Sequence, residues 1–84
     1  MGVWYLELDD EITDAVARLR AAGEGPVILV LPAGSRVGTG RINFRLLARE
    51  AGARSIELAI VSADPQIRAL AATAGIAAHG DRKS

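Results

Sequence analysis

Short apolar segments alternate three times with segments of helical periodicity in this 84-residue chain. The apolar segments cover residues 3–8, 27–31 and 55–62, and their composition predicts β-strands. After each of them, apolar residues recur at every third or fourth position, as on one face of an amphipathic helix. Because a strand, a helix and a second strand in this order form a parallel pair, the chain is predicted to be an α/β protein with a mainly parallel sheet.

Stripes of apolar residues predict three helices. The stripes consist of Ile12, Ala15, Val16 and Leu19 in the first helix, Phe44, Leu47, Ala48 and Ala51 in the second, and Ile67, Leu70, Ala71 and Ala74 in the third. The second helix is expected to begin between positions 39 and 41, and the third at Asp64 and Pro65, a cap and a first helical residue. The helices are expected to end at Gly23, Gly52 and Gly75.

The segment at 27–31 has no polar side chain, which is typical of a central strand buried on both faces. Right-handed crossovers leave two windings open for such units. In one, helices cover both faces of the sheet, and in the other one face stays partly bare. A bare face would favour dimerisation or docking to another domain.

These elements predict one small Rossmann-like domain with three to four strands and three helices. A chain of 84 residues has room for a single core. We expect the domain to span residues 1–78, of which 76–78 could add a short fourth strand. Residues 79–84 are polar and unpatterned, so they are predicted to form a tail or linker.

The charges are segregated although their formal sum is zero. Half of the acidic residues lie between positions 7 and 14, whereas five arginines between positions 36 and 54 are opposed by Glu50 alone. Zero net charge argues against a nucleic-acid partner held by phosphate contacts. No apolar run approaches the roughly 18 residues of a membrane span. We therefore expect a soluble domain that makes no membrane contact through this segment.

A glycine-rich turn at 34–41 follows the central strand. It lacks the Lys-Ser or Lys-Thr of a P-loop and the spacing of a dinucleotide fingerprint. Helix amides, a hydroxyl group and a guanidinium group could still bind a small anion, a phosphate or a nucleotide. The candidate anion-binding residues are Ser35, Gly38, Thr39, Gly40 and Arg41. The alternative is a structural turn in which Thr39 caps the helix and the glycines supply positive φ angles.

Four arginines, Arg36, Arg41, Arg45 and Arg49, form a predicted interaction face on the turn and the second helix. Positions 41, 45 and 49 share one helical side, away from the apolar stripe. The partner could be another protein or the acidic first helix of a second copy, which would give a homodimer held by charge. The alternative is a solvated helix surface.

Catalytic and metal-binding constellations are missing from the sequence. The chain has no cysteine and a single histidine, His79, near its end. Glu7, Asp9 and Asp10 follow a strand but have no further carboxylate on the neighbouring strand, so they are interpreted as partners of the helix dipole. We expect no enzyme activity, no cofactor and no metal site.

The segments YLELDDEIT, LVLPAGSR, INFRLLAREA and IVSADPQIRALAATAGI resemble an uncharacterised α/β domain at the N-terminus of bacterial hypothetical proteins, some described as baseplate J-like. The resemblance covers almost the whole chain. It implies the cytoplasmic head of a larger protein in which a linker and a membrane span follow. It supplies no catalytic residues.

The chain also resembles STAS domains, which occur in anti-sigma factor antagonists and anion transporters. Residues 37–40 fall where that family has an Asp-Ser-Ser-Gly phosphorylation turn, and Thr39 and Gly40 match it. The acidic residue of the motif is missing, so the resemblance implies a small protein-binding module more than a phosphorylation switch at Thr39. The sequence thus predicts a non-catalytic protein-interaction module, with an anion-sensing or nucleotide-sensing domain as the alternative.

Overall fold

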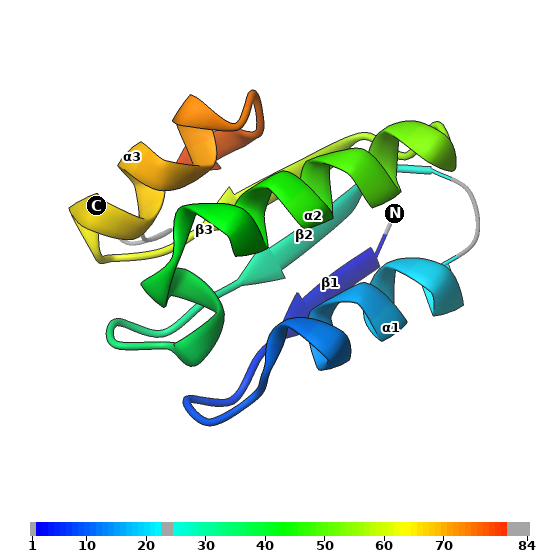
Figure 1. The fold of residues 1–84 in the computed structure, drawn as a ribbon. Helices are drawn as coiled ribbons and strands as arrows, with labels where there is room; N and C mark the ends of the chain where they lie inside the picture. Colours follow the sequence, from blue (N-terminus) through cyan, green and yellow to red (C-terminus); the bar gives the residue numbers. More distant parts are fainter. Residues whose placement is uncertain (1, 23–24, 81–84) are drawn as a thin grey trace.

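The computed structural model describes residues 2–22 and 25–80 and shows four parallel strands with three α-helices (Figure 1). In chain order the elements are β1 (Gly2–Tyr5), α1 (Ile12–Ala22), β2 (Val27–Val30), the 3-10 helix η1 (Arg36–Thr39), α2 (Arg41–Ala53), β3 (Leu58–Val61), α3 (Pro65–Thr73) and β4 (Ala77–His79). The predicted small Rossmann-like α/β fold is confirmed, and the optional fourth strand is present.

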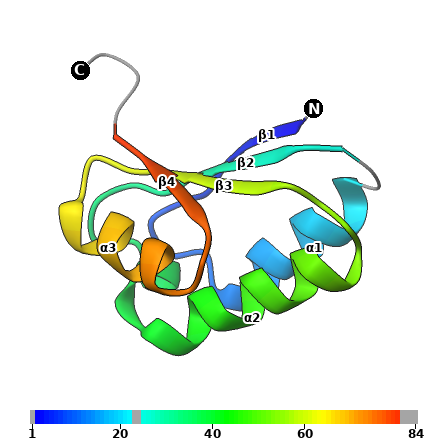
Figure 2. The same cartoon turned by 90° about the horizontal axis from the view of Figure 1, so that it is seen from above.

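The strands lie in the order β1-β2-β3-β4, and each is parallel to its neighbours. Every crossover therefore moves one strand further in the same direction. A right-handed connection that always moves in one direction returns on the same side of the sheet each time. Figure 2 shows the result, with α1, α2 and α3 all on one face. Of the two windings that the sequence left open, the chain adopts the one with a bare face.

The core fills the space between the sheet and the helices. Trp4, Leu29, Ile60 and Ala78 lie side by side across the four strands and face the helices. The helices contribute the fully buried residues Leu19, Phe44, Leu47, Ile67 and Ala71. The predicted apolar stripes are confirmed, since every member is buried or packs against this core.

The expectation that the central strand is buried on both faces is wrong. Val27 and Leu29 of β2 are buried, but Ile28 and Val30 between them are only partly covered. Side chains alternate between the two faces of a strand, so these two residues point away from the helices. The apolar run shows that both faces of β2 carry apolar side chains, but it does not show whether helices cover both faces.

The strands are shorter than predicted because turns begin early. The Asp10 carboxylate accepts a hydrogen bond from the Glu7 backbone amide at 2.7 Å, which closes a turn directly after Leu6. The third strand begins only at Leu58. The fourth covers Ala77–His79, so His79 belongs to the sheet rather than to a tail. Residues 81–84 of the predicted tail lie outside the described residues.

The predicted start of α3 is confirmed, with an Asp64 carboxylate oxygen accepting from the Gln66 amide at 2.9 Å. Gly75 follows α3 with a φ of 85°, as expected of a glycine that ends a helix. The prediction for α2 is wrong, because this helix continues through Gly52 to Ala53 and the left-handed residue is Ser55, with a φ of 56°. Gly23 lies outside the described residues.

The two left-handed positions predict opposite effects on stability. Gly75→Ala should lower the free energy of unfolding by about 1–2 kcal/mol, because an L side chain disfavours positive φ. No heavy atom beyond the neighbouring residues lies within 4 Å of an added Cβ, so the cost would come from the backbone alone. Ser55→Gly should raise stability by up to about 1 kcal/mol. Urea unfolding followed by circular dichroism measures both changes, and equal signs would contradict the assignment.

Candidate functional site

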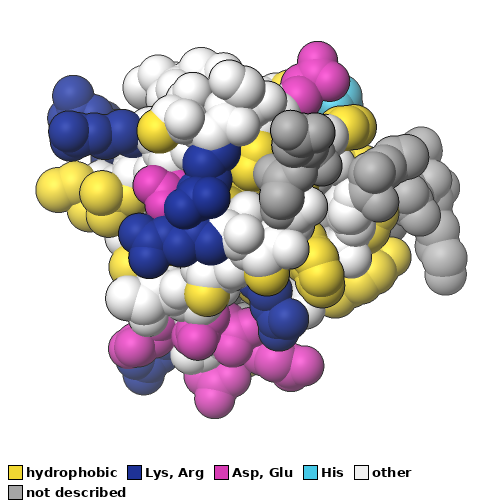
Figure 3. All heavy atoms as spheres, turned by 90° about the vertical axis from the view of Figure 1, so that its right-hand side faces the viewer, with side chains coloured by type: hydrophobic (Ala, Val, Ile, Leu, Met, Phe, Trp, Pro, Cys, Tyr) yellow, Lys and Arg dark blue, Asp and Glu magenta, His cyan; other side chains and the backbone are white. Residues whose placement is uncertain are grey.

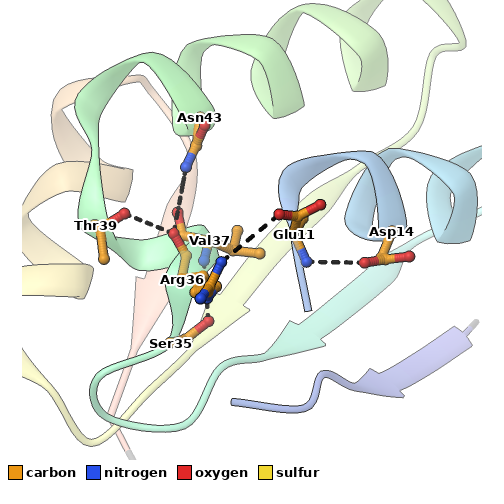
Figure 4. A network of polar contacts seen from close by, with 7 residues as sticks. All are labelled: Glu11, Asp14, Ser35, Arg36, Val37, Thr39 and Asn43. Carbon is orange, nitrogen blue, oxygen red and sulfur yellow. Dashed lines mark hydrogen bonds and ion pairs between the residues drawn. The ribbon is translucent and has the colours of Figure 1, made fainter. Parts of the chain in front are cut away.

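The glycine-rich turn between β2 and α2 is held by contacts within itself and with α3 (Figure 4). The buried Ser35 Oγ accepts a hydrogen bond from the Val37 amide at 3.2 Å. The Thr39 hydroxyl donates to the Arg36 carbonyl at 2.7 Å, and the Asn43 side-chain amide donates to the Val37 carbonyl at 3.1 Å. These bonds satisfy the polar groups of the turn locally.

Gly38 allows the turn to approach α3 closely. A Cβ added to this buried glycine would lie 2.6 Å from both Cγ1 and Cδ1 of Ile67, closer than carbon atoms can pack. Ile67 is itself buried in the core. Gly40 has a different role, since it is the N-cap residue of α2 and its surroundings are open. The interpretation of Thr39 as the helix cap is therefore wrong, because Thr39 ends η1.

The five candidate anion-binding residues do not surround one space. Ser35 and Gly38 are buried within the turn. Thr39 lines a hollow of about 400 Å³ together with Glu11 and Arg36, whose opposite charges pair with each other. Arg41 lines a separate hollow of about 460 Å³ between α2 and the end of α3. Thr39, Gly40 and Arg41 could meet a ligand from solvent, but Thr39 and Arg41 open onto different hollows.

The strand order is also relevant to nucleotide binding. In open α/β sheets, ligands bind outside the carboxyl ends of the strands at the point where the strand order reverses. The order β1-β2-β3-β4 contains no reversal. The described sheet therefore lacks the crevice that a doubly wound fold offers to a nucleotide.

The predicted arginine face is divided between neighbouring surfaces. Arg36 lies 3.7 Å from the exposed Glu11 carboxylate at the start of α1. Arg41 and Arg45 border α3, whereas Arg49 lies on the opposite side, in a groove between α1 and α2. All four side chains are exposed, and within residues 2–22 and 25–80 the last three take part in no ion pair.

The groove between α1 and α2 is larger than the hollows at Thr39 and at Arg41. It measures about 800 Å³, and apolar side chains such as Ile12, Val16 and Leu46 form much of its lining. Glu50 closes it through an ion pair with Arg20 at 2.8 Å and a second contact with Arg54 at 3.5 Å. The hydrogen bond from Arg20 holds the pKa of the Glu50 carboxyl below its ordinary value of 4.5. This contact ties α1 to α2.

The outer face of the sheet is the partly bare face that one of the two predicted windings leaves open, and the structure shows which residues form it. Its residues share the register positions that point away from the helices, namely Val3, Tyr5, Ile28, Val30, Ala59, Val61, Ala77 and His79. None of these eight residues is charged as Asp, Glu, Lys or Arg are, and all eight are exposed or partly exposed. Figure 3 shows hydrophobic side chains along the sheet side of the molecule, on the right, while carboxylates gather below.

A signal for this face was present in the sequence. The three predicted strands remain apolar at alternate positions on both of their sides, and the observed winding places all three helices on one side. The choice between the two windings decides which side is left open, and no local pattern encodes that choice.

The acidic residues at the end of β1 have structural roles. The Asp14 carboxylate accepts from the Glu11 amide at 2.8 Å, and Asp10 closes the turn before it. The part of the chain that the structure describes contains no cluster of His, Cys, Asp and Glu able to hold a metal ion. Its helices are also too short or too polar to span a bilayer.

Comparisons with protein-family models, with curated proteins and with solved structures find no match to this chain.

The close approach at Gly38 predicts a strong response to one methyl group. Gly38→Ala should lower the free energy of unfolding by about 1–3 kcal/mol, because the new Cβ must displace the buried Ile67. Gly40→Ala is the matched control in the same turn. Loss of the favourable N-cap glycine lowers stability, whereas the lower entropy of the unfolded chain raises it. The free energy of unfolding should therefore change by no more than about 0.5 kcal/mol. Equal losses in urea unfolding would contradict the packing role of Gly38.

The ion pair between α1 and α2 predicts a dependence on pH. The folded-state pKa of Glu50 is lowered, so its carboxylate stabilises the fold above the unfolded value near 4.5, and this contribution disappears as the pH falls through the folded pKa. Glu50→Gln should therefore lower the melting temperature at pH 7 and have less effect at pH 3. Glu57→Gln, outside the ion pairs of the described residues, is the control. A pH-independent difference for Glu50→Gln would contradict the assignment.

Proposed function

We propose that this domain is a non-catalytic protein-interaction module and that it docks through the outer face of its sheet. The observation that carries the proposal is an all-parallel sheet with helices on one face only. Parallel sheets occur almost only with both faces covered, because their strands are apolar on both sides. A second layer supplied by another polypeptide would complete the arrangement.

The composition of the outer face supports this function. Aliphatic residues fill six of its eight positions, and its two polar residues, Tyr5 and His79, lie on the edge strands β1 and β4. Apolar surface gains roughly 25 cal/mol for each Å² removed from water. Contiguous apolar patches with polar rims mark interaction sites on soluble proteins. The partner that fits the outer face is therefore a protein surface with an apolar centre.

The competing function, a sensor of anions or nucleotides at residues 34–41, has less support. Two of its candidate residues, Ser35 and Gly38, are buried and engaged in the turn. The arginine face is likewise a less suitable docking surface, because its members are spread over the α2–α3 and α1–α2 sides. The role as cytoplasmic head of a larger bacterial protein follows from the resemblance alone and stays a prediction.

The docking face predicts selective binding of an apolar probe. The fluorescent dye bis-ANS should bind the chain at a dilution where sedimentation shows a monomer, because the outer face is then open to solvent. Ile28→Lys combined with Val61→Lys should remove most of the fluorescence gain. The control pair, Ala69→Lys with Ala72→Lys, changes exposed residues of α3 and should preserve it. Dye binding that the first pair leaves intact would contradict the proposed docking face.

A further inference from the structure

We propose that the groove between α1 and α2 binds an amphipathic helix of another protein, which carries acidic residues in its first turn and lies antiparallel to α1 and α2. The groove belongs to the helical layer, on the opposite side of the sheet from the outer face. The inference therefore goes beyond the proposed docking function and does not depend on it. The shape and the charges of the groove identify the partner.

The groove lies between two helices that run side by side in the same direction, since each returns along the parallel sheet after its strand (Figure 1). Arg20 of α1 contacts Glu50 of α2 at 2.8 Å, which fixes one level of the pair. Ile12 and Asn43 line a common hollow and fix another level. Between Ile12 and Arg20, α1 rises about 12 Å. The groove is therefore at least about two helical turns long.

The walls of the groove allow another backbone to approach closely. Ala17 and Ala21 of α1 and Ala53 of α2 line it with short side chains. Packed helices lie about 8–10 Å apart, and the smallest separations occur where the side chains at the contact are small. A third helix can therefore rest against α1 and α2 together.

The wall formed by α2 exposes large apolar side chains. Ile42 and Leu46 are 68% and 45% exposed, and Leu46, Arg49 and Ala53 line the groove. These four residues are spaced by four, three and four positions, so they form one stripe along the helix. A helix that docks in a groove makes contacts of this kind with apolar residues on its own facing side.

The shallow form of the groove favours a helix over a small molecule. Ile12, Val16 and Glu50 are partly buried, and the other residues that line the groove are exposed. Sites for small molecules usually enclose most of the ligand surface. A small molecule would stay largely in water here, whereas a helix about 10 Å wide can contact both walls.

The charges of the groove favour a partner with carboxylates. Among the described residues that line it, Glu50 alone carries a carboxylate, and this group is shared by Arg20 at 2.8 Å and Arg54 at 3.5 Å. Arg49 also lines the groove, is exposed, and takes part in no ion pair within residues 2–22 and 25–80. Carboxylates of a partner would meet an excess of guanidinium groups, whereas a basic partner would be repelled.

The distribution of these groups along the groove sets the direction of the partner. Ile12, Val16 and Leu46 lie nearer the first turns of α1 and α2, whereas Arg20 and Arg49 lie nearer the last turns. An antiparallel helix would place its own first turn beside the arginines. Acidic residues are favoured in the first turn of a helix by its dipole and disfavoured in the last. The antiparallel arrangement therefore suits both the groove and the bound helix.

A display library of helical peptides tests the chemistry and the direction of the partner. Each peptide carries apolar residues at positions i, i+3, i+4 and i+7, with acidic, basic or neutral residues in its first or last turn. Selection on the immobilised chain should enrich peptides with an acidic first turn at least about fivefold over peptides with an acidic last turn. Peptides with a basic first turn should be depleted.

Variants of the chain show whether the enriched peptide lies in the groove. Arg49→Glu should raise its dissociation constant at least about tenfold, whereas the control Arg41→Glu changes the α3 side of the same helix and should have no effect. Leu46→Gln should also raise it about tenfold. The control Leu8→Gln changes a leucine outside the groove that is 57% exposed. Circular dichroism verifies that all four variants are folded.

The outcomes separate this inference from the proposed function. Selection that enriches no helical peptide, or that favours an acidic last turn, overturns the inference. Equal effects of Arg49→Glu and Arg41→Glu overturn it as well, because an acidic first turn would then have been selected for its own helix stability. Binding that Ile28→Lys removes and Leu46→Gln leaves intact would assign the peptide to the outer sheet face. That result would overturn the inference and support the proposed docking function.

Discussion

The handedness of three successive crossovers determines the form of this molecule. Each connection is right-handed and moves to the next strand in the same direction, so α1, α2 and α3 return to one side of the sheet. The buried residues of β2 and β3 meet the helices, while Ile28, Val30 and Val61 remain on the open side. The helical layer therefore covers one face of the sheet, and no helix of the described residues covers the other.

The sequence predicted the elements better than it predicted their arrangement. Apolar periodicity located all three helices, and Asp64 with Pro65 marked the start of α3 correctly. Both are local signals. Helix α2 continues past Gly52 to Ala53, and Ser55 takes the left-handed conformation just before Ile56, which is buried in the core. The strand order depends on contacts between distant segments, which no local pattern specifies.

Contacts between distant segments also decide the structure of the candidate site, and the local sequence pattern did not reveal them. A glycine-rich turn after an apolar strand suggested ligand binding, but Gly38 is required for its contact with Ile67, far along the chain in α3. Arg41, Arg45 and Arg49 were correctly expected to be exposed, but α2 lies between α1 and α3, so that Arg41 and Arg45 border α3 whereas Arg49 borders the groove with α1. A bare sheet face was predicted only as one of two possible windings, because an alternating position such as Ile28 becomes exposed only when the winding leaves it without a helix.

Methyl NMR of the dilute monomer with a water-soluble paramagnetic agent measures whether the apolar outer face of the sheet is open to solvent in the single chain. We expect strong broadening of the Ile28, Val30 and Val61 methyl signals and little effect on Leu29 and Ile60, which lie on the helix side of the same strands. Equal protection of both sets would contradict this expectation, since a layer of the chain itself would then cover the outer face.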